Sequence, residues 1–117
     1  MATRAIQRGS VYYIDLSRHA GRLQKKRPVV VIQNDVGNRF SSETIVVAVR
    51  DAHGGRLLPI FVPVEAGVGG LPKASIIDAG HVNTVSADDL EGPIGTLPAE
   101  VMSRVDAALR VSLSLAT

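Results

Sequence analysis

The fold of this chain is decided by one stretch, which reads Arg27-Pro28-Val29-Val30-Val31-Ile32-Gln33-Asn34-Asp35. Residues 29–32 of this stretch are four β-branched side chains in a row, with no polar residue between them. A strand with one face in water alternates apolar and polar residues, so this run predicts a strand that is buried on both faces. Pro28 has no N–H to donate to a sheet, which suits the start of such a strand. The turn formers Asn34-Asp35 and Gly37-Asn38 predict a turn after it.

Shorter runs rich in β-forming residues lie on both sides of this strand. We predict further strands at Ser10–Leu16, Thr44–Val49, Leu57–Val64, Ala74–Ala79, Val82–Val85 and Gly92–Gly95. Pro59 and Pro63 interrupt one of these runs, so the strand over Leu57–Val64 should lie at an edge of the sheet. Ser86 is a good helix cap and predicts one helical turn over Ser86–Leu90.

The end of the chain has a helical period instead. Apolar residues recur every four positions, at Val101, Val105, Leu109 and Leu113. This spacing predicts an amphipathic helix that packs one face on the sheet, with Asp106 and Arg110 paired along its surface. Many short strands followed by one helix predict a mainly β (β-rich α+β) fold. We expect a small, partly open β-barrel or a strongly bent antiparallel sheet.

Composition limits the chemistry that the chain can perform. Its 117 residues, 45% hydrophobic and 21% charged, indicate one globular domain over residues 1–117. The absence of cysteine excludes disulfides, cysteine-based zinc sites and a thiol nucleophile. The histidines His19, His53 and His81 lack metal-binding spacing, so we expect no metal and no cofactor. No apolar run approaches the roughly 20 residues that span a bilayer, and no signal peptide is evident, so we expect a cytoplasmic protein with no membrane partner.

The charges are divided unevenly along the chain. Residues 1–60 carry ten Lys and Arg against four Asp and Glu, whereas residues 61–117 carry three against seven. Five cations gather within ten residues, at Arg18, Arg22, Lys25, Lys26 and Arg27, in a segment that reads as a loop between two strands. Such a loop could grip phosphates, and the alternative is a solvated loop whose charge aids solubility.

Several motifs together resemble a known family. The opening Arg8-Gly9-Ser10-Val11-Tyr12, followed by Asp15-Leu16, is similar to the opening of the MazF/PemK toxin family. The stretch Arg27–Asp35, continued by Gly37-Asn38-Arg39-Phe40-Ser41, resembles the most recognisable block of that family. Further matches follow in the family's order, at Leu58-Pro59, Ser75, Asp89-Leu90, Ile94-Gly95 and the helix from Val101 to Leu115. The resemblance therefore covers about residues 7–115, nearly the whole chain.

The resemblance implies a fold, an activity and partners. The fold would be an SH3-like, CcdB-type barrel with a C-terminal helix, usually assembled as a homodimer. The activity would be that of a toxin which, without a metal, cleaves single-stranded mRNA at short specific sequences. The 2′-hydroxyl of the RNA is the nucleophile, so DNA of the same sequence should bind but survive. An acidic MazE-like antitoxin would block the site.

The resemblance also implies site residues. The family's catalytic arginine falls on Arg27, where a guanidinium fork would neutralise the scissile phosphate. Arg50 stands where the family often has a catalytic Thr or Ser, and it would add a second positive charge. His81 falls near the family's RNA-binding face and would supply acid/base capacity, the alternative being a polar residue that ends a strand. The side chains that would guide the RNA strand are Arg22, Gln24, Lys25, Lys26 and His19.

Three departures from the family pattern keep a second function open. Arg50 offers no hydroxyl, Leu23 replaces a common glutamate, and Gly80-His81-Val82-Asn83-Thr84 replaces the common Glu-Gln-Ile-Arg-Thr. The alternative to an endoribonuclease is a binding module of the same fold, with weak or no nuclease activity. Such a module would grip RNA or a protein, as the CcdB-type toxins grip gyrase.

Overall fold

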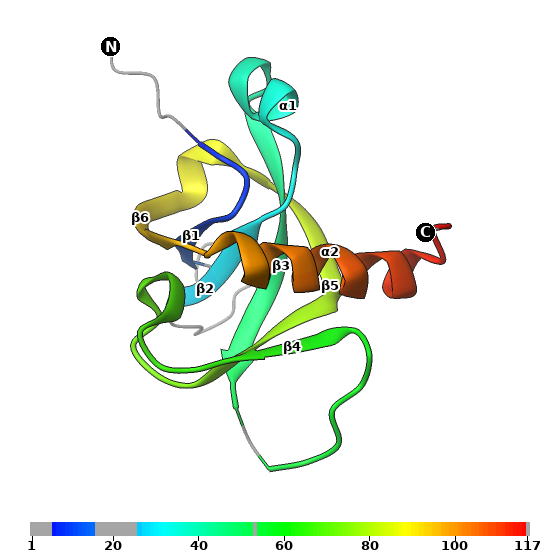
Figure 1. The fold of residues 1–117 in the computed structure, drawn as a ribbon. Helices are drawn as coiled ribbons and strands as arrows, with labels where there is room; N and C mark the ends of the chain where they lie inside the picture. The colour runs from blue at the N-terminus through cyan, green and yellow to red at the C-terminus, as the bar shows by residue number, and fades with distance from the viewer. Residues whose placement is uncertain (1–5, 16–25, 53, 117) are drawn as a thin grey trace.

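The computed structural model describes residues 6–15, 26–52 and 54–116 (Figure 1). Its strands are β1 (Ser10–Asp15), β2 (Lys26–Val31), β3 (Glu43–Asp51), β4 (Phe61–Val64), β5 (Ser75–Ser86) and β6 (Leu90–Thr96). Its helices are α1 (Asp35–Phe40) and α2 (Ala99–Leu113), with 3-10 turns η2 (Val68–Gly70) and η3 (Ala87–Asp89). The six strands form one antiparallel sheet in the order β4-β5-β3-β2-β1-β6.

Strand β2 is buried on both faces, as its run of β-branched residues predicts. Val30 belongs to the larger hydrophobic core, whereas its neighbours Val29 and Val31 belong to a second core on the opposite face. The second core also contains Tyr12 of β1 and Val46 of β3. Successive side chains of a strand point to opposite faces, so three consecutive valines fix β2 between two apolar layers.

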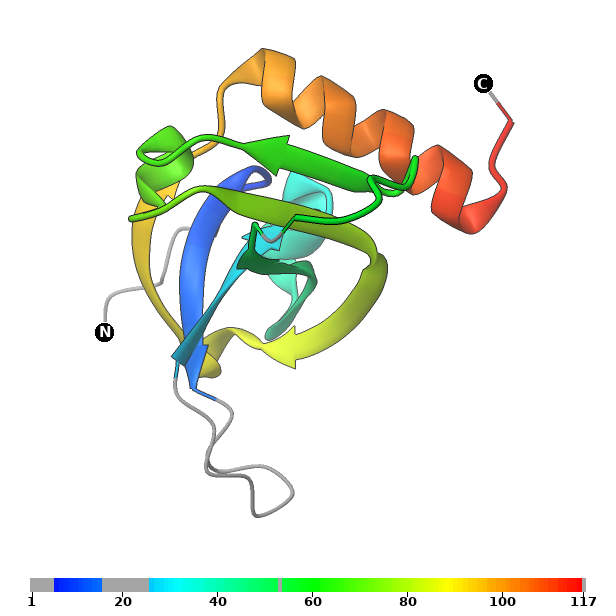
Figure 2. The ribbon, with the colours of Figure 1, turned by 90° about the horizontal axis from the view of Figure 1, so that it is seen from below.

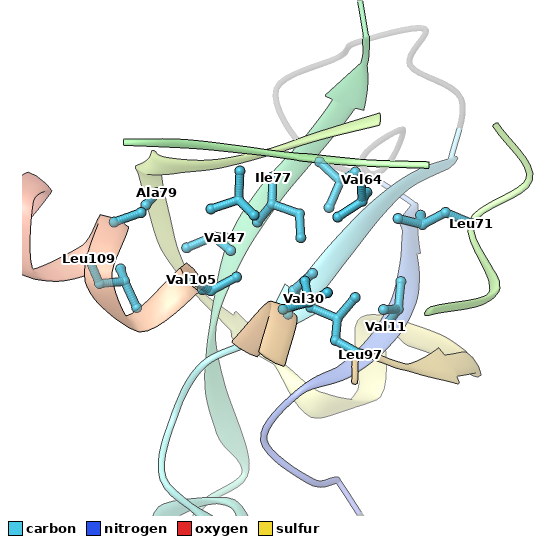
Figure 3. Close-up of a cluster of buried hydrophobic side chains, with 14 residues drawn as sticks. Val11, Val30, Val47, Val64, Leu71, Ile77, Ala79, Leu97, Val105 and Leu109 are labelled. Carbon is cyan, nitrogen blue, oxygen red and sulfur yellow. The ribbon is translucent and has the colours of Figure 1, made fainter. Parts of the chain in front are cut away.

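Helix α2 covers the larger core. Its buried residues Val101, Val105, Ala108 and Leu109 lie on one stripe, as the four-residue period predicts, but Leu113, the last residue of the predicted stripe, is 53% exposed. Figure 3 shows Val105 and Leu109 packed against Val47 and Ile77 of the sheet. The carboxylate of Asp106 lies 2.7 Å from the Arg8 guanidinium, a partner 98 residues away that helical spacing could not predict.

The sheet bends strongly, which confirms the predicted fold class. Figure 2 shows the strands curving around an interior, with α2 lying across one side. Strand β5 pairs with β4 through its first residues and with β3 along most of its length. Strand β4 forms the edge of the sheet, as its prolines predict, although it begins at Phe61 instead of Leu57.

The prediction of two separate strands at Ala74–Ala79 and Val82–Val85 is wrong. Both belong to β5, which runs unbroken from Ser75 to Ser86. The pairing with β3 passes from Val47↔Val82 directly to Ala48↔Asp78, so residues 79–81 form a bulge opposite a single step of β3. Gly80 indicates a break in the sequence pattern, but in the structure it lies in this bulge and the strand continues.

The predicted turn after β2 is also wrong, because α1 stands there. Asn34 caps this helix and its side chain accepts a hydrogen bond from Gly37 N at 2.8 Å. Asn38 is buried and accepts a 2.6 Å hydrogen bond from the Thr44 hydroxyl of β3. The turn-forming residues therefore act as a helix cap and as an anchor to the sheet.

Asp35 joins α1 to the segment that precedes β1. Its Oδ1 accepts hydrogen bonds from Arg8 N at 2.7 Å and from the Asn38 amide at 3.1 Å. The bond from the Arg8 backbone, followed by that from Asn38, lowers the pKa of Asp35 below its ordinary 3.8.

The burial of β2 in the larger core can be tested with Val30, whose side chain is fully buried. Val30→Ala removes two methyl groups and leaves a cavity, so we expect the free energy of unfolding to fall by about 2–3 kcal/mol. The matched control is Val111→Ala, because that side chain on α2 is 55% exposed. Its effect should stay below about 0.5 kcal/mol. Urea titration measures both, and equal effects would contradict the burial argument.

The contacts of Asp35 predict a pH dependence of stability. A carboxyl with a lowered folded-state pKa stabilises the fold above its unfolded value and loses that contribution as pH falls through the folded value. The stability gap between the wild type and Asp35→Asn should therefore be largest near neutral pH and shrink as pH drops below the ordinary 3.8 of the carboxyl. Urea unfolding at a series of pH values measures the gap, and a gap that grew on acidification would refute the assignment.

Candidate active site

A groove of about 880 Å³ lies across β2, β3 and β5. Pro28, Val29 and Ala48 give it an apolar part, and Arg27, Arg50 and His81 give it charged and titratable groups. The three residues predicted to be catalytic thus come from three different strands and line one groove. The spacing of these residues in the sequence does not predict that they lie close together. The order of the strands in the sheet brings them to one groove.

Arg27 is the second residue of β2 and pairs with Ile14 of β1. It is exposed, while Val29 and the valines after it are buried. The strand therefore carries its cation at the point where the apolar run leaves the core. A guanidinium at such a place presents several N–H donors to a ligand in the groove.

Arg50 lies near the end of β3 and is held from two sides. Its guanidinium carbon sits 4.6 Å from the ring centroid of Phe61 on β4, a cation–π arrangement. Its Nη2 lies 3.8 Å from Oδ2 of Asp78 on β5. The side chain is still 46% exposed, so it can meet a ligand while its position is restrained.

The alternative interpretation of His81, a polar residue that ends a strand, is wrong. It lies within β5 at the bulge, and its Nδ1 is 2.9 Å from Oδ2 of Asp78. The other carboxylate oxygen of Asp78 accepts a 2.8 Å hydrogen bond from Gly80 N. The Asp78 side chain is only 3% exposed, whereas that of His81 is 67% exposed.

Sequence reasoning missed Asp78 and Phe61. The signal for Asp78 was an acid within the apolar run Ser75-Ile76-Ile77-Asp78-Ala79. A carboxylate is rarely buried unless it is paired, so its place in that run required a partner. The contact of Phe61 with Arg50 left no local signal, because it depends on β4 pairing with β5.

Lys26 precedes Arg27 on β2 and forms a 2.6 Å ion pair with Glu91 of β6. The hydrogen bond and the charge of Glu91 raise the pKa of Lys26 above its ordinary 10.5. Part of its charge is thus already compensated. The other predicted RNA-binding residues lie outside the described residues; these are His19, Arg22, Gln24 and Lys25. Arg18, Leu23 and His53 also lie outside them.

Residues 6–15, 26–52 and 54–116 contain no group of three or more His, Cys, Asp or Glu residues placed to hold a metal ion. No helix within the same ranges has the length and apolar character to cross a membrane.

Two guanidinium groups and one imidazole beside a carboxylate suit a specific chemistry. The guanidiniums can neutralise a phosphate, and the imidazole can move a proton near neutral pH.

A model of the PemK-like, MazF-like toxins of type II toxin-antitoxin systems matches residues 7–113. The chain belongs to this family. The resemblance read from the sequence is thereby confirmed, and with it the assignment to a class of endoribonuclease toxins.

Two curated relatives of this MazF-like chain are named endoribonucleases. It is 40% identical over 111 residues to endoribonuclease EndoA of Bacillus subtilis (strain 168), covering 94% of this chain and 96% of the relative. It is 39% identical over 111 residues to endoribonuclease MazF of Staphylococcus epidermidis, covering 94% and 92%.

Solved structures confirm the MazF-like fold. An endoribonuclease in complex with its cognate antitoxin, from a mycobacterial species, superposes with a TM-score of 0.81 at 23% identity, covering 97% of this chain and 99% of that one. A MazE–MazF structure from Deinococcus radiodurans superposes with a TM-score of 0.76 at 17% identity, covering 97% and 100%.

Proposed function

We propose that this chain is an endoribonuclease that cleaves single-stranded mRNA in the groove at short specific sequences, without a metal. The observation that carries the proposal is that Arg27, Arg50 and His81 line one groove. Two relatives that are named endoribonucleases, at 40% and 39% identity, support it.

The proposed reaction uses the nucleophile that RNA itself contains. The 2′-oxygen attacks the adjacent phosphorus, the bond from phosphorus to the 5′-oxygen breaks, and the products are a 2′,3′-cyclic phosphate and a free 5′-hydroxyl. Nε2 of His81 accepts the 2′-hydroxyl proton, and the leaving 5′-oxygen takes a proton from water in the open groove. The hydroxide that remains takes the proton from the His81 imidazolium, so the ring becomes neutral again and no proton is gained or lost overall. No atom changes its oxidation state, so the step needs no oxidant or reductant.

The two arginines act on the phosphate. Negative charge grows on its non-bridging oxygens during the attack, and preorganised cations next to those oxygens lower the barrier. Arg27 supplies the first cation and Arg50 the second. Phe61 and Asp78 restrain Arg50, so little reorganisation is needed when the phosphate arrives. Arg50 thus stabilises charge at a position where the family often has a hydroxyl.

We further propose how the RNA strand and the partner proteins bind. Lys26 and the predicted residues His19, Arg22, Gln24 and Lys25 guide the RNA toward Arg27, through contacts that weaken as salt rises. The working unit is a homodimer in the cytoplasm. An acidic MazE-like antitoxin competes with RNA for the cations between Arg18 and Arg27 and for Arg50, in keeping with the MazE–MazF complex of a protein that shares this fold.

The experiment is cleavage of a long single-stranded RNA in EDTA by the purified chain. We expect discrete products with 5′-hydroxyl ends. In Arg27→Ala the loss of one phosphate-stabilising group should lower kcat/KM by about 100-fold or more. The matched control is Arg39→Ala, which removes the same charge from α1, outside the groove, and should change kcat/KM by less than about two-fold.

The same assay separates the nuclease from its alternative. RNA that is shifted in a gel but left uncut by the wild type would favour the binding module. A single 2′-deoxy substitution at the cleavage site should abolish cutting while leaving binding intact, because it removes only the nucleophile. Cleavage of that substituted RNA would rule out the proposed mechanism.

A further inference from the structure

We infer that Asp78 is a positioning residue whose buried carboxylate holds His81 with Nε2 unprotonated toward the groove and restrains Arg50 beside it. The inference rests on the proposed function and concerns how the chain prepares its base. It starts from three contacts of one carboxylate: 2.9 Å to His81 Nδ1, 2.8 Å to Gly80 N and 3.8 Å to Arg50 Nη2.

The burial of Asp78 needs an explanation. Its side chain is 3% exposed and stands between Ile77 and Ala79, both in the hydrophobic core. A carboxylate in such a place destabilises a fold unless hydrogen bonds and opposite charges compensate it. Two of its three partners are side chains that line the groove. Proteins break local rules of this kind chiefly at functional sites, so the burial points to the groove.

The geometry of β5 shows how the contact with His81 arises. In a regular strand, residues three apart point to opposite faces and lie about 10 Å apart, because each residue advances about 3.3 Å. Asp78 and His81 nevertheless meet at 2.9 Å. Residues 79–81 have no partners on β3, and this bulge turns His81 back toward Asp78.

Asp78 also holds the bulge that brings His81 to it. Its Oδ1 accepts the hydrogen bond from Gly80 N, in the middle of the bulge. A Cβ at Gly80 would lie 2.8 Å from Ile60 Cδ1 and 3.1 Å from Asp78 Oδ1, so glycine fits there without displacing its neighbours. The two oxygens of one carboxylate thus fix the backbone and the imidazole together.

The contact sets the proton arrangement of the imidazole. A carboxylate only accepts hydrogen bonds, so Nδ1 of His81 must carry the proton that it donates to Asp78. In the neutral ring the remaining nitrogen, Nε2, then has a free lone pair and can accept a proton from a 2′-hydroxyl. Once the proton is taken, the carboxylate stabilises the imidazolium, as in other Asp–His pairs.

Asp78→Asn tests the inference with little change of shape. The amide can donate to Nδ1 and thereby favour the tautomer with hydrogen on Nε2, which cannot act as a base. We expect kcat to fall by about 100-fold, the order of a general-base contribution, with KM changed by less than about three-fold. The matched control is Asp51→Asn, since that carboxylate pairs with the exposed Lys73 at 3.2 Å and does not line the groove. It should leave kcat within about two-fold.

A double-mutant cycle separates positioning from general structural damage. If Asp78 acts mainly through His81, then adding Asp78→Asn to His81→Ala should lower kcat far less than Asp78→Asn lowers that of the wild type, because only the restraint of Arg50 is then lost. Losses that multiply in the double variant would overturn the inference.

A spectroscopic readout needs no variant and no activity. In the ¹⁵N spectrum of the wild-type chain, neutral His81 should show Nδ1 protonated and Nε2 unprotonated. The reverse assignment would overturn the inference even if Asp78→Asn failed to fold. The tautomer does not depend on cleavage, so a wild type that cut no RNA would contradict the proposed function while this measurement still decided the role of Asp78.

Discussion

Val29, Val30 and Val31 place alternate side chains in two separate hydrophobic cores, so both faces of β2 are buried at these three residues. One core must then be covered by α2 and the other by the curving of β1, β3 and β6 around it, which forces the sheet to bend. Full burial of each valine contributes roughly 1.5–3 kcal/mol, so the arrangement is strongly favoured. The burial of the three valines also fixes the position of β2 along its own direction. The charged end of β2, with Arg27, therefore lies at the groove.

The groove combines this fixed strand with a distorted one. β2 and β3 supply Arg27 and Arg50 from regular pairing, whereas β5 supplies His81 from a bulge. Asp78 connects the two kinds of strand, because it contacts Arg50 across the sheet and His81 along its own strand. The single buried carboxylate of Asp78 thereby fixes the position of the phosphate-binding Arg50 relative to the base His81.

Much of this could be predicted from local patterns in the sequence. The two-sided burial of β2, the edge position of β4 and the apolar stripe of α2 each follow from a few adjacent residues, and all three are found. The resemblance to the family led to Arg27, Arg50 and His81. The continuity of β5 and the helix at α1 could not be predicted, because a glycine or asparagine reads alike in a turn, a bulge and a cap. The contacts of Asp78 and Phe61 depend on strand pairing between distant segments.

The central claim is that the groove holds the scissile phosphate between two guanidiniums with the imidazole beside the nucleophile. A crystal structure with an RNA that carries a 2′-deoxy residue at the cleavage site tests this directly, because the substrate is then bound but intact. We predict that the phosphate at the cleavage site lies within hydrogen-bond distance of Arg27 and Arg50. His81 Nε2 should lie about 3–4 Å from the 2′-carbon that lacks its oxygen. A phosphate bound away from both arginines, or a 2′-carbon on the side of the strand remote from His81, would contradict it.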